Sequence, residues 1–182
     1  MTGLYGNALS NGLVPEKVLM LHSSLDLAEV ARLVLDASVP DLADAAAVFV
    51  LDDPHRVEKS GGEVVVRRLG TRLAHAIQPM TQATFPAGEV IALGGDSPYA
   101  RCMSDGEPVI FAQPDSQTLE RVRPVGREML SRYGCFLAVP AVHDGEVTGF
   151  VALARTSRAA RFSDADVVTA SRPVPEPVWP TS

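Results

Sequence analysis

Residues 135–154, CFLAVPAVHDGEVTGFVALA, contain the pattern that decides the fold. An apolar run over 135–142 is followed by Asp144-Gly145 and then by a second run over 146–154. Asp-Gly between two β-forming runs indicates a type I′ turn, because that turn needs a positive φ at both central residues. The stretch therefore predicts an antiparallel hairpin in the C-terminal part of the chain.

A helix and a second pair of strands are predicted on the N-terminal side. Ser23 and Ser24 can cap a helix that begins near Asp26 and ends before Pro40. Its apolar residues recur at the spacing of one helix face; they are Leu27, Val30, Ala31, Val34 and Leu35. The short apolar run 45–51 is typical of a strand buried on both faces. With the β-rich run 63–69 it predicts a second hairpin.

The segment between the two hairpins, residues 71–134, is mixed in pattern and is interrupted by glycines. Ser97-Pro98 predicts the start of a short helix over 98–103, because serine is a good N-cap and proline suits the first helical position. Gly106 is expected to end this helix. A short strand is predicted over 108–111.

The last predicted elements are two helices. The stretch 118–133 has a helical pattern that Pro124 is expected to kink or split. Ser163 can cap a final short helix over 163–171, and the prolines that begin at Pro173 prevent its continuation. The order helix, hairpin, mixed segment, hairpin, helix predicts an α+β fold with a central antiparallel sheet.

Composition limits the functional class. The chain has 182 residues and a net charge of −6, which fits one domain and argues against binding to nucleic acid. We divide it into an arm over 1–22, a domain over 23–171 and a Pro-rich tail over 172–182. Two cysteines, no signal peptide and no apolar run of membrane-spanning length lead us to expect a cytoplasmic protein without membrane contact.

Several stretches together resemble a GAF domain. They are Leu25-Asp26-Leu27, the strand DAAAVFVL over 44–51, Phe85-Pro86 ahead of SPYAR over 97–101, and FLAVP over 136–140 leading to GEVTG over 145–149. The likeness covers about residues 25–170. More narrowly, the chain is similar to bacterial GAF domains that lie ahead of a SpoIIE-type serine/threonine phosphatase.

This resemblance implies an antiparallel sheet of five to six strands, with helices on one face and a loop-roofed pocket on the other, the roof being residues 71–134. It implies a sensor that binds a small ligand or a protein partner and regulates a phosphatase-type output, whose domain we expect to be absent from this chain. It also implies a homodimer or a complex with a GAF-phosphatase homologue. The final helix is shorter than the family pattern, so a truncated interaction or decoy module is an alternative.

The predicted site lies in the mixed segment. Four of the chain's ten aromatic side chains are there, and pockets are lined by aromatic and apolar groups with a few polar ones. The predicted ligand-binding residues are Phe85, Tyr99, Arg101, Cys102, Phe111 and Tyr133. Arg101 would be the polar anchor of a cavity of the order of 300 Å³. The alternative interpretation is that the rings only fill the core beneath the loops.

We predict no catalytic residues, metal ligands or cofactor. The sequence contains no GxSxG, HExxH or GxGxxG motif. Asn7 and Asn11, the only asparagines, precede the domain, and Cys102 is not followed by histidine, so neither cyclic-nucleotide binding nor bilin attachment is expected. One enzymatic alternative remains, a redox function of Cys102, because neighbouring Arg101 could lower the pKa of its thiol. The other interpretation is that Cys102 and Cys135 are buried apolar residues.

Overall fold

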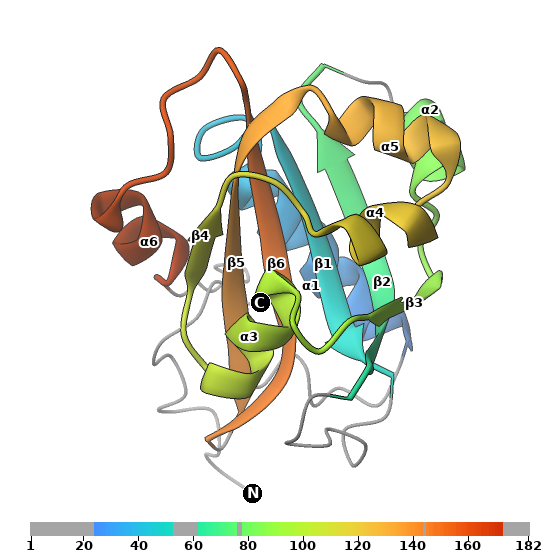
Figure 1. Ribbon diagram of the computed structural model, residues 1–182, viewed down its shortest axis with the longest axis vertical. Helices are drawn as coiled ribbons and strands as arrows, with labels where there is room; N and C mark the ends of the chain where they lie inside the picture. The colour runs from blue at the N-terminus through green and yellow to red at the C-terminus, as the bar shows by residue number, and fades with distance from the viewer. Residues whose placement is uncertain (1–23, 53–61, 76–77, 144, 173–182) are drawn as a thin grey trace, which may run out of the picture.

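The computed structural model describes residues 24–52, 62–75, 78–143 and 145–172. The predicted arm and nearly all of the predicted tail lie outside these ranges. Within them the chain forms an antiparallel sheet of six strands in the order β3-β2-β1-β6-β5-β4 (Figure 1). The strands are β1 (Ala45–Leu51), β2 (Val64–Leu73), β3 (Val90–Leu93), β4 (Val109–Phe111), β5 (Tyr133–His143) and β6 (Glu146–Thr156).

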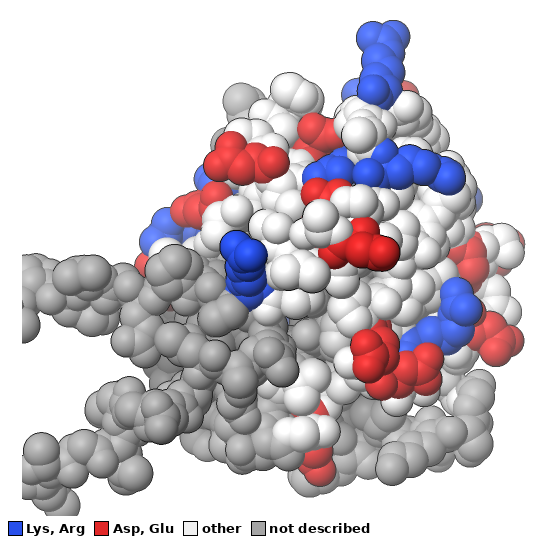
Figure 2. Space-filling view, turned by 90° about the vertical axis from the view of Figure 1, so that its left-hand side faces the viewer, with Lys and Arg blue, Asp and Glu red and all other residues white. Residues whose placement is uncertain are grey.

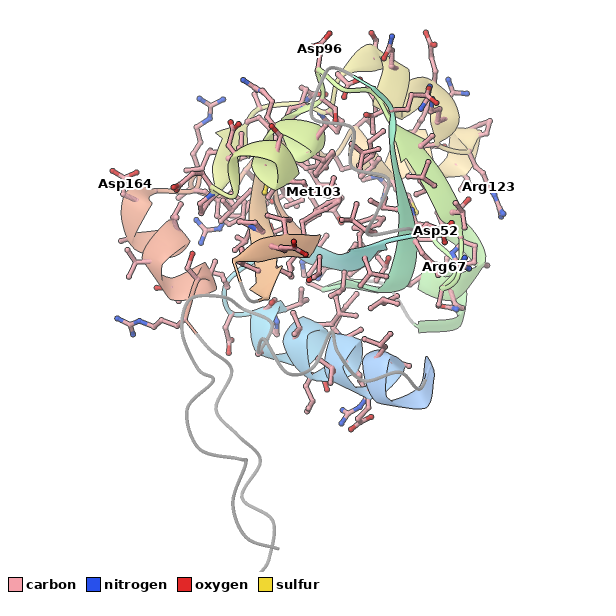
Figure 3. The ribbon with its side chains drawn as sticks, turned by 90° about the horizontal axis from the view of Figure 1, so that it is seen from below. Asp52, Arg67, Asp96, Met103, Arg123 and Asp164 are labelled. Carbon is pink, nitrogen blue, oxygen red and sulfur yellow. The ribbon has the colours of Figure 1, made fainter. Side chains whose placement is uncertain are left out.

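Helices cover both faces of this sheet. The long helix α1 (Ser24–Ser38) lies on one face, and short helices lie on the other (Figures 1 and 3). The short ones are α2 (Gln78–Thr84), α3 (Pro98–Asp105), α4 (Ser116–Arg121) and α5 (Pro124–Leu130). The last helix, α6 (Asp164–Ala170), contributes Ala170 to the core on the α1 side. The predicted α+β class is confirmed.

The predicted C-terminal hairpin is confirmed as β5 and β6. Ala138 pairs with Ala152 and Val139 with Val151, and Gly145 in the turn has a φ of 79°. β6 also pairs with β1, and β1 pairs with β2. The two hairpins therefore join at β1 and β6, which form the middle of the sheet.

Alternation along the strands gives the sheet two cores. The core beneath α1 contains fully buried aliphatic side chains, among them Val34, Leu137 and Leu153. The opposite face carries a core rich in aromatic rings, with Phe150 and Tyr99 at its centre. β1 contributes to both cores, as a continuous apolar run predicts.

Within residues 71–134 the structure shows the expected split at Pro124 and adds two elements that were not predicted. The predicted helix over 118–133 is split, with α4 ending at Arg121 and α5 beginning at Pro124. Proline cannot donate the hydrogen bond that would continue α4 and fits well as the first residue of α5. Helix α2 and strand β3 were not predicted, because both are short and lie between glycines and prolines that indicate loops.

Arg155, near the end of β6, is held by contacts with several parts of the fold. Its Nε donates to the carbonyl of Leu42 (3.0 Å) and its Nη2 donates to Asp166 (2.9 Å), while its guanidinium lies 4.3 Å from the ring centre of Phe162. Only 16% of the Arg155 side chain is exposed. It therefore connects α6 and the preceding loop to the sheet.

Asp166 makes the attachment of α6 dependent on pH. Hydrogen bonds from Arg155, then from Ser163, hold the pKa of Asp166 below its usual value. Because the pKa of Asp166 is lower in the folded state than its unfolded-state value of about 4, the ionised carboxylate stabilises the fold at pH values above the unfolded-state pKa. This contribution to stability is lost as the pH falls through the folded-state pKa.

We expect Asp166→Asn to lower the free energy of unfolding by about 1–3 kcal/mol at pH 7 and by much less near pH 2.5. Urea denaturation at both pH values measures this. The matched control is Asp164→Asn at the same helix terminus, where Asp164 points outward (Figure 3). An Asp166→Asn loss that is equal at both pH values would contradict the assignment.

The charged surface is mixed. On the face that Figure 2 shows, basic and acidic side chains lie among one another and much of the area carries neither. Within the described ranges, none of the helices has both the length and the apolar character that a bilayer crossing requires.

Candidate functional site

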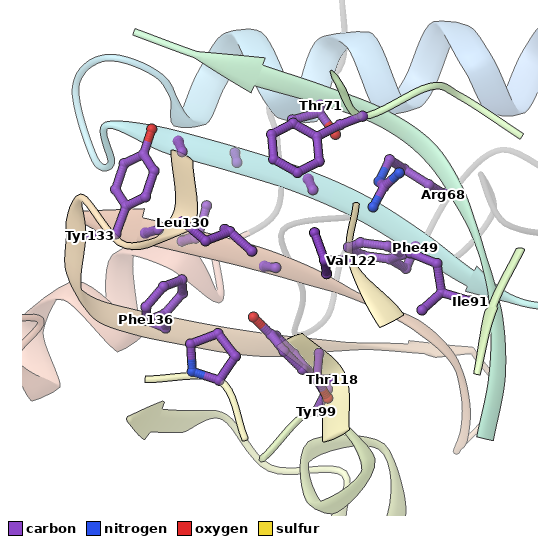
Figure 4. A pocket seen from close by; sticks show the side chains of 18 of the residues that line it. Phe49, Arg68, Thr71, Ile91, Tyr99, Thr118, Val122, Leu130, Tyr133 and Phe136 are labelled. Atoms are coloured by element: carbon purple, nitrogen blue, oxygen red, sulfur yellow. The ribbon is translucent and has the colours of Figure 1, made fainter. Parts of the chain in front are cut away.

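A cavity of about 100 Å³ lies between the aromatic face of the sheet and helices α3 to α5 (Figure 4). Its floor is made by alanines on the two central strands. Ala45 pairs with Ala154, and Ala47 pairs with Ala152, so four methyl groups lie on one face of β1 and β6. Because alanine side chains are short, this part of the sheet is not filled by its own residues.

Aromatic rings form the walls of the cavity. Phe150 stacks on Phe49 at a centroid distance of 4.8 Å and on Tyr99 at 5.1 Å. Tyr133 and Arg68 lie at opposite ends of the row of alanines (Figure 4). Burial raises the pKa of both tyrosines, so each is a neutral phenol near pH 7.

The roof consists of α4, α5 and the residues before them. Thr118, Val122 and Leu130 face the cavity (Figure 4). The start of α4 is capped by Asp115, which accepts from the backbone N–H of Thr118 at 2.9 Å. Hydrogen bonds from Arg121 to the carbonyl of Ala92 and to Glu63 tie the roof to β2 and β3. These ties involve partly exposed side chains and contribute little stability.

Arg68 brings a charge into this apolar site. Its side chain is only 5% exposed, and its guanidinium lies 5.4 Å from the ring centres of both Phe49 and Phe85. Nη1 donates to the carboxylate of Glu89 and, at 3.5 Å, to the carbonyl of Pro86. Burial lowers the pKa of Arg68, and the hydrogen bond to Glu89 opposes that shift, so the group stays charged.

A β-bulge in β2 places Thr71 on the same face as Arg68. Val48 of β1 pairs with Gly70 whereas Phe49 pairs with Arg68, so Leu69 is an extra residue without a partner. In a regular strand, residues three positions apart point to opposite faces. The bulge reverses this alternation, and both side chains line the cavity (Figure 4).

The structure brings three of the six predicted site residues together. Phe85, Tyr99 and Tyr133 line the cavity, and their role in binding remains a prediction. Phe111 does not line it but packs behind the wall, edge-on to Tyr99 at 5.1 Å. Arg101 was predicted as the polar anchor; it is exposed on the outer side of α3, whose other central residues are buried.

Cys102 requires a correction. It does not line the cavity and is completely buried beneath α3. Burial, with a smaller contribution from the nearby Asp105, raises the pKa of its thiol to about 12, the reverse of the lowering expected from Arg101. A thiol with this pKa is protonated near neutral pH and is a poor nucleophile. The structure therefore favours the other interpretation of Cys102, as a buried apolar residue.

The predicted cavity size is also corrected. The space is about 100 Å³ rather than 300 Å³, because Phe49, Phe85 and Val122 fill much of the volume between sheet and roof. A dry cavity of about 150 Å³ in another protein holds benzene. The present cavity therefore limits a ligand to a molecule smaller than benzene in this conformation.

Three polar residues of the cavity were missed, Arg68, Thr71 and Thr118. The sequence did carry a signal for Arg68, since the alternation Val64, Val66, Arg68 places it on the same face as two buried valines. Thr71 could not be found in this way, because the bulge that turns it inward depends on pairing with β1.

The fold and the cavity define an α+β module with a small, partly open site between a sheet and a layer of short helices. The GAF domain family model matches residues 24–172, and the chain belongs to this family, whose members are commonly sensor domains of signalling proteins. No curated protein was found to match the chain.

Two solved structures illustrate the likeness. The GAF domain/HD domain protein of Geobacter sulfurreducens has 20% identity and a TM-score of 0.50, with 82% of this chain and 86% of that chain covered. The GAF domain of a phosphoenolpyruvate-protein phosphotransferase from Coxiella burnetii has 22% identity and the same TM-score, with 79% and 77% covered. At such identities the likeness concerns the fold alone.

Proposed function

We propose that this GAF domain is a sensor that binds a small molecule in the cavity above Ala47 and Ala152 and passes the bound state to a signalling output. One observation carries the proposal. A partly open, mostly apolar space contains a few polar side chains, among them Arg68 and Thr71, as expected of a ligand site. The weak ties of the roof support a small displacement of α4 and α5 as the transmitted change.

The output is the less specific part of the proposal. The sequence likeness to GAF domains ahead of SpoIIE-type phosphatases favours a phosphatase-type output, reached through a homodimer or a GAF-phosphatase homologue. The buried thiol of Cys102 argues against the redox alternative.

We expect Ala152→Leu to fill the cavity and abolish the binding of xenon, a probe of small apolar cavities. The added carbons enter empty space, so we expect the free energy of unfolding to change by less than about 1.5 kcal/mol. Amide spectra recorded with and without xenon measure binding, and urea denaturation measures stability.

Ala165→Leu, on the exposed surface of α6, is the matched control and should bind xenon as the original protein does. The cavity assignment fails if Ala152→Leu still binds xenon at the same residues, or if the wild-type protein shows no xenon-dependent shifts around Ala47 and Ala152.

A further inference from the structure

Two buried side-chain polar atoms in the described part of the chain have no hydrogen-bond partner, and they are Arg68 Nε and Thr71 Oγ1. Both belong to residues that line the cavity. Buried polar groups in native proteins are nearly always paired, and one left alone destabilises the fold. The unsatisfied atoms are thus concentrated in the candidate ligand site, where an incoming molecule can pair with them.

The Arg68 side chain is held in place while its Nε–H stays unpaired. Glu89 engages Nη1, and the rings of Phe49 and Phe85 lie at equal distances from the guanidinium. These contacts fix the planar group and leave Nε–H without an acceptor. A donor that is already oriented loses little conformational entropy when it binds a ligand.

The chemistry of the site selects an anion. Arg68 has only donors, and the threonine hydroxyl can donate as well. A carboxylate has two oxygens that can accept from two such donors, and hydrogen bonds between ionised groups are about twice as strong as neutral ones. Burial away from water strengthens the pairing further.

The rest of the cavity determines the size and polarity of the part of the anion beyond its carboxylate. The floor of alanines and the walls of aromatic rings offer apolar contact, which a bare inorganic ion would not use. A volume of about 100 Å³ admits only a few non-hydrogen atoms beyond the carboxylate.

We propose, on the basis of the proposed function, that the cavity binds a short-chain monocarboxylic acid, with its carboxylate accepting from Arg68 Nε–H and the Thr71 hydroxyl and its apolar chain above Ala47 and Ala152. Glu89 stays on Nη1, so it need not leave for the acid to enter. Arg68 and Thr71 are thereby the residues that determine the ligand class.

The test compares propionate, which is smaller than benzene, with propionamide, which has nearly the same shape as propionate and no charge. Spectra of protein carrying ¹⁵N-arginine observe the Arg68 Nε–H directly. We expect propionate to shift this resonance and to bind at least about tenfold more tightly than the amide. Equal affinity for the acid and the amide, or a resonance that does not move, would overturn the carboxylate subsite.

Two variants locate the contact. Arg68→Lys keeps the positive charge but lacks the Nε–H, and we expect it to weaken propionate binding by about 30-fold. Thr71→Val keeps the side-chain shape and is expected to weaken it by about fivefold. An affinity that neither substitution changes contradicts the proposal, and Thr71→Val provides this test even if Arg68→Lys does not fold.

Xenon binding separates this inference from the proposed function. If the wild-type protein binds xenon in the cavity but binds neither propionate nor propionamide, the carboxylate subsite is wrong and the cavity remains a small-molecule site. If xenon does not bind either, both proposals fail.

Discussion

Replacing Gly149 with alanine is expected to lower the free energy of unfolding by about 3–5 kcal/mol, a large effect for one added methyl group. A Cβ on Gly149 would lie 2.2 Å from the carbonyl oxygen of Phe49 and 2.9 Å from the Cα of Val50. Both atoms belong to the backbone of β1, which is hydrogen-bonded on both sides in the middle of the sheet. Relief therefore requires β1 and β6 to separate.

Gly70→Ala is the matched control. Its Cβ would meet only the Cδ1 of Leu35, at 3.1 Å, and the end of a leucine side chain can move. We expect a loss of less than about 1.5 kcal/mol. Urea denaturation of both variants gives the comparison, and a Gly149→Ala variant as stable as Gly70→Ala would show that the β1–β6 contact is looser than described.

The sequence alone could predict the elements that depend on local signals, but not a contact between distant strands such as the one at Gly149. The hairpin of β5 and β6 depends on a local turn at Gly145 and on neighbouring apolar runs, so its pattern was sufficient. Helix α3 was predicted for a similar reason, since its cap at Ser97 and its end at Gly106 are local signals. The pairing of β1 with β6 joins residues about 100 positions apart and could only be inferred from the family resemblance.

The cavity depends on such distant pairing. The alanines at 45–47 were read correctly as part of a buried strand. They form a floor only because Ala152 and Ala154 of β6 lie beside them in register. No pattern within one segment could reveal this.

The polar part of the site was predicted at the wrong residue for a physical reason. Arg101 lies in the segment that the resemblance identified as the roof, but the period of α3 places it on the solvent side while Cys102 is buried. Arg68 was overlooked because consecutive Arg67 and Arg68 suggest an exposed strand. Strand alternation sends only Arg67 outward, where it pairs with Asp52 at 2.5 Å.

The second large expected effect on stability concerns Phe150, in the aromatic wall of the cavity. We expect Phe150→Ala to lower the free energy of unfolding by about 3–5 kcal/mol, because Phe150 is 1% exposed and stacks on both Phe49 and Tyr99. The space left by the ring adjoins the existing cavity of about 100 Å³, since Phe150 lines it. The enlarged cavity should therefore admit benzene, which the wild-type cavity is too small to hold.

Binding of benzene to the folded state alone stabilises the variant by mass action, so the expected result is a rise in its thermal midpoint with benzene concentration. Leu137→Ala is the control, because Leu137 is equally buried but belongs to the core beneath α1, on the other face of the sheet. It should lose a comparable amount of stability, about 2–5 kcal/mol, and gain less from benzene. Equal stabilisation of the two variants by benzene would show that the space left by Phe150 is separate from the existing cavity. The cavity would then be closed off between Tyr99 and the alanine floor.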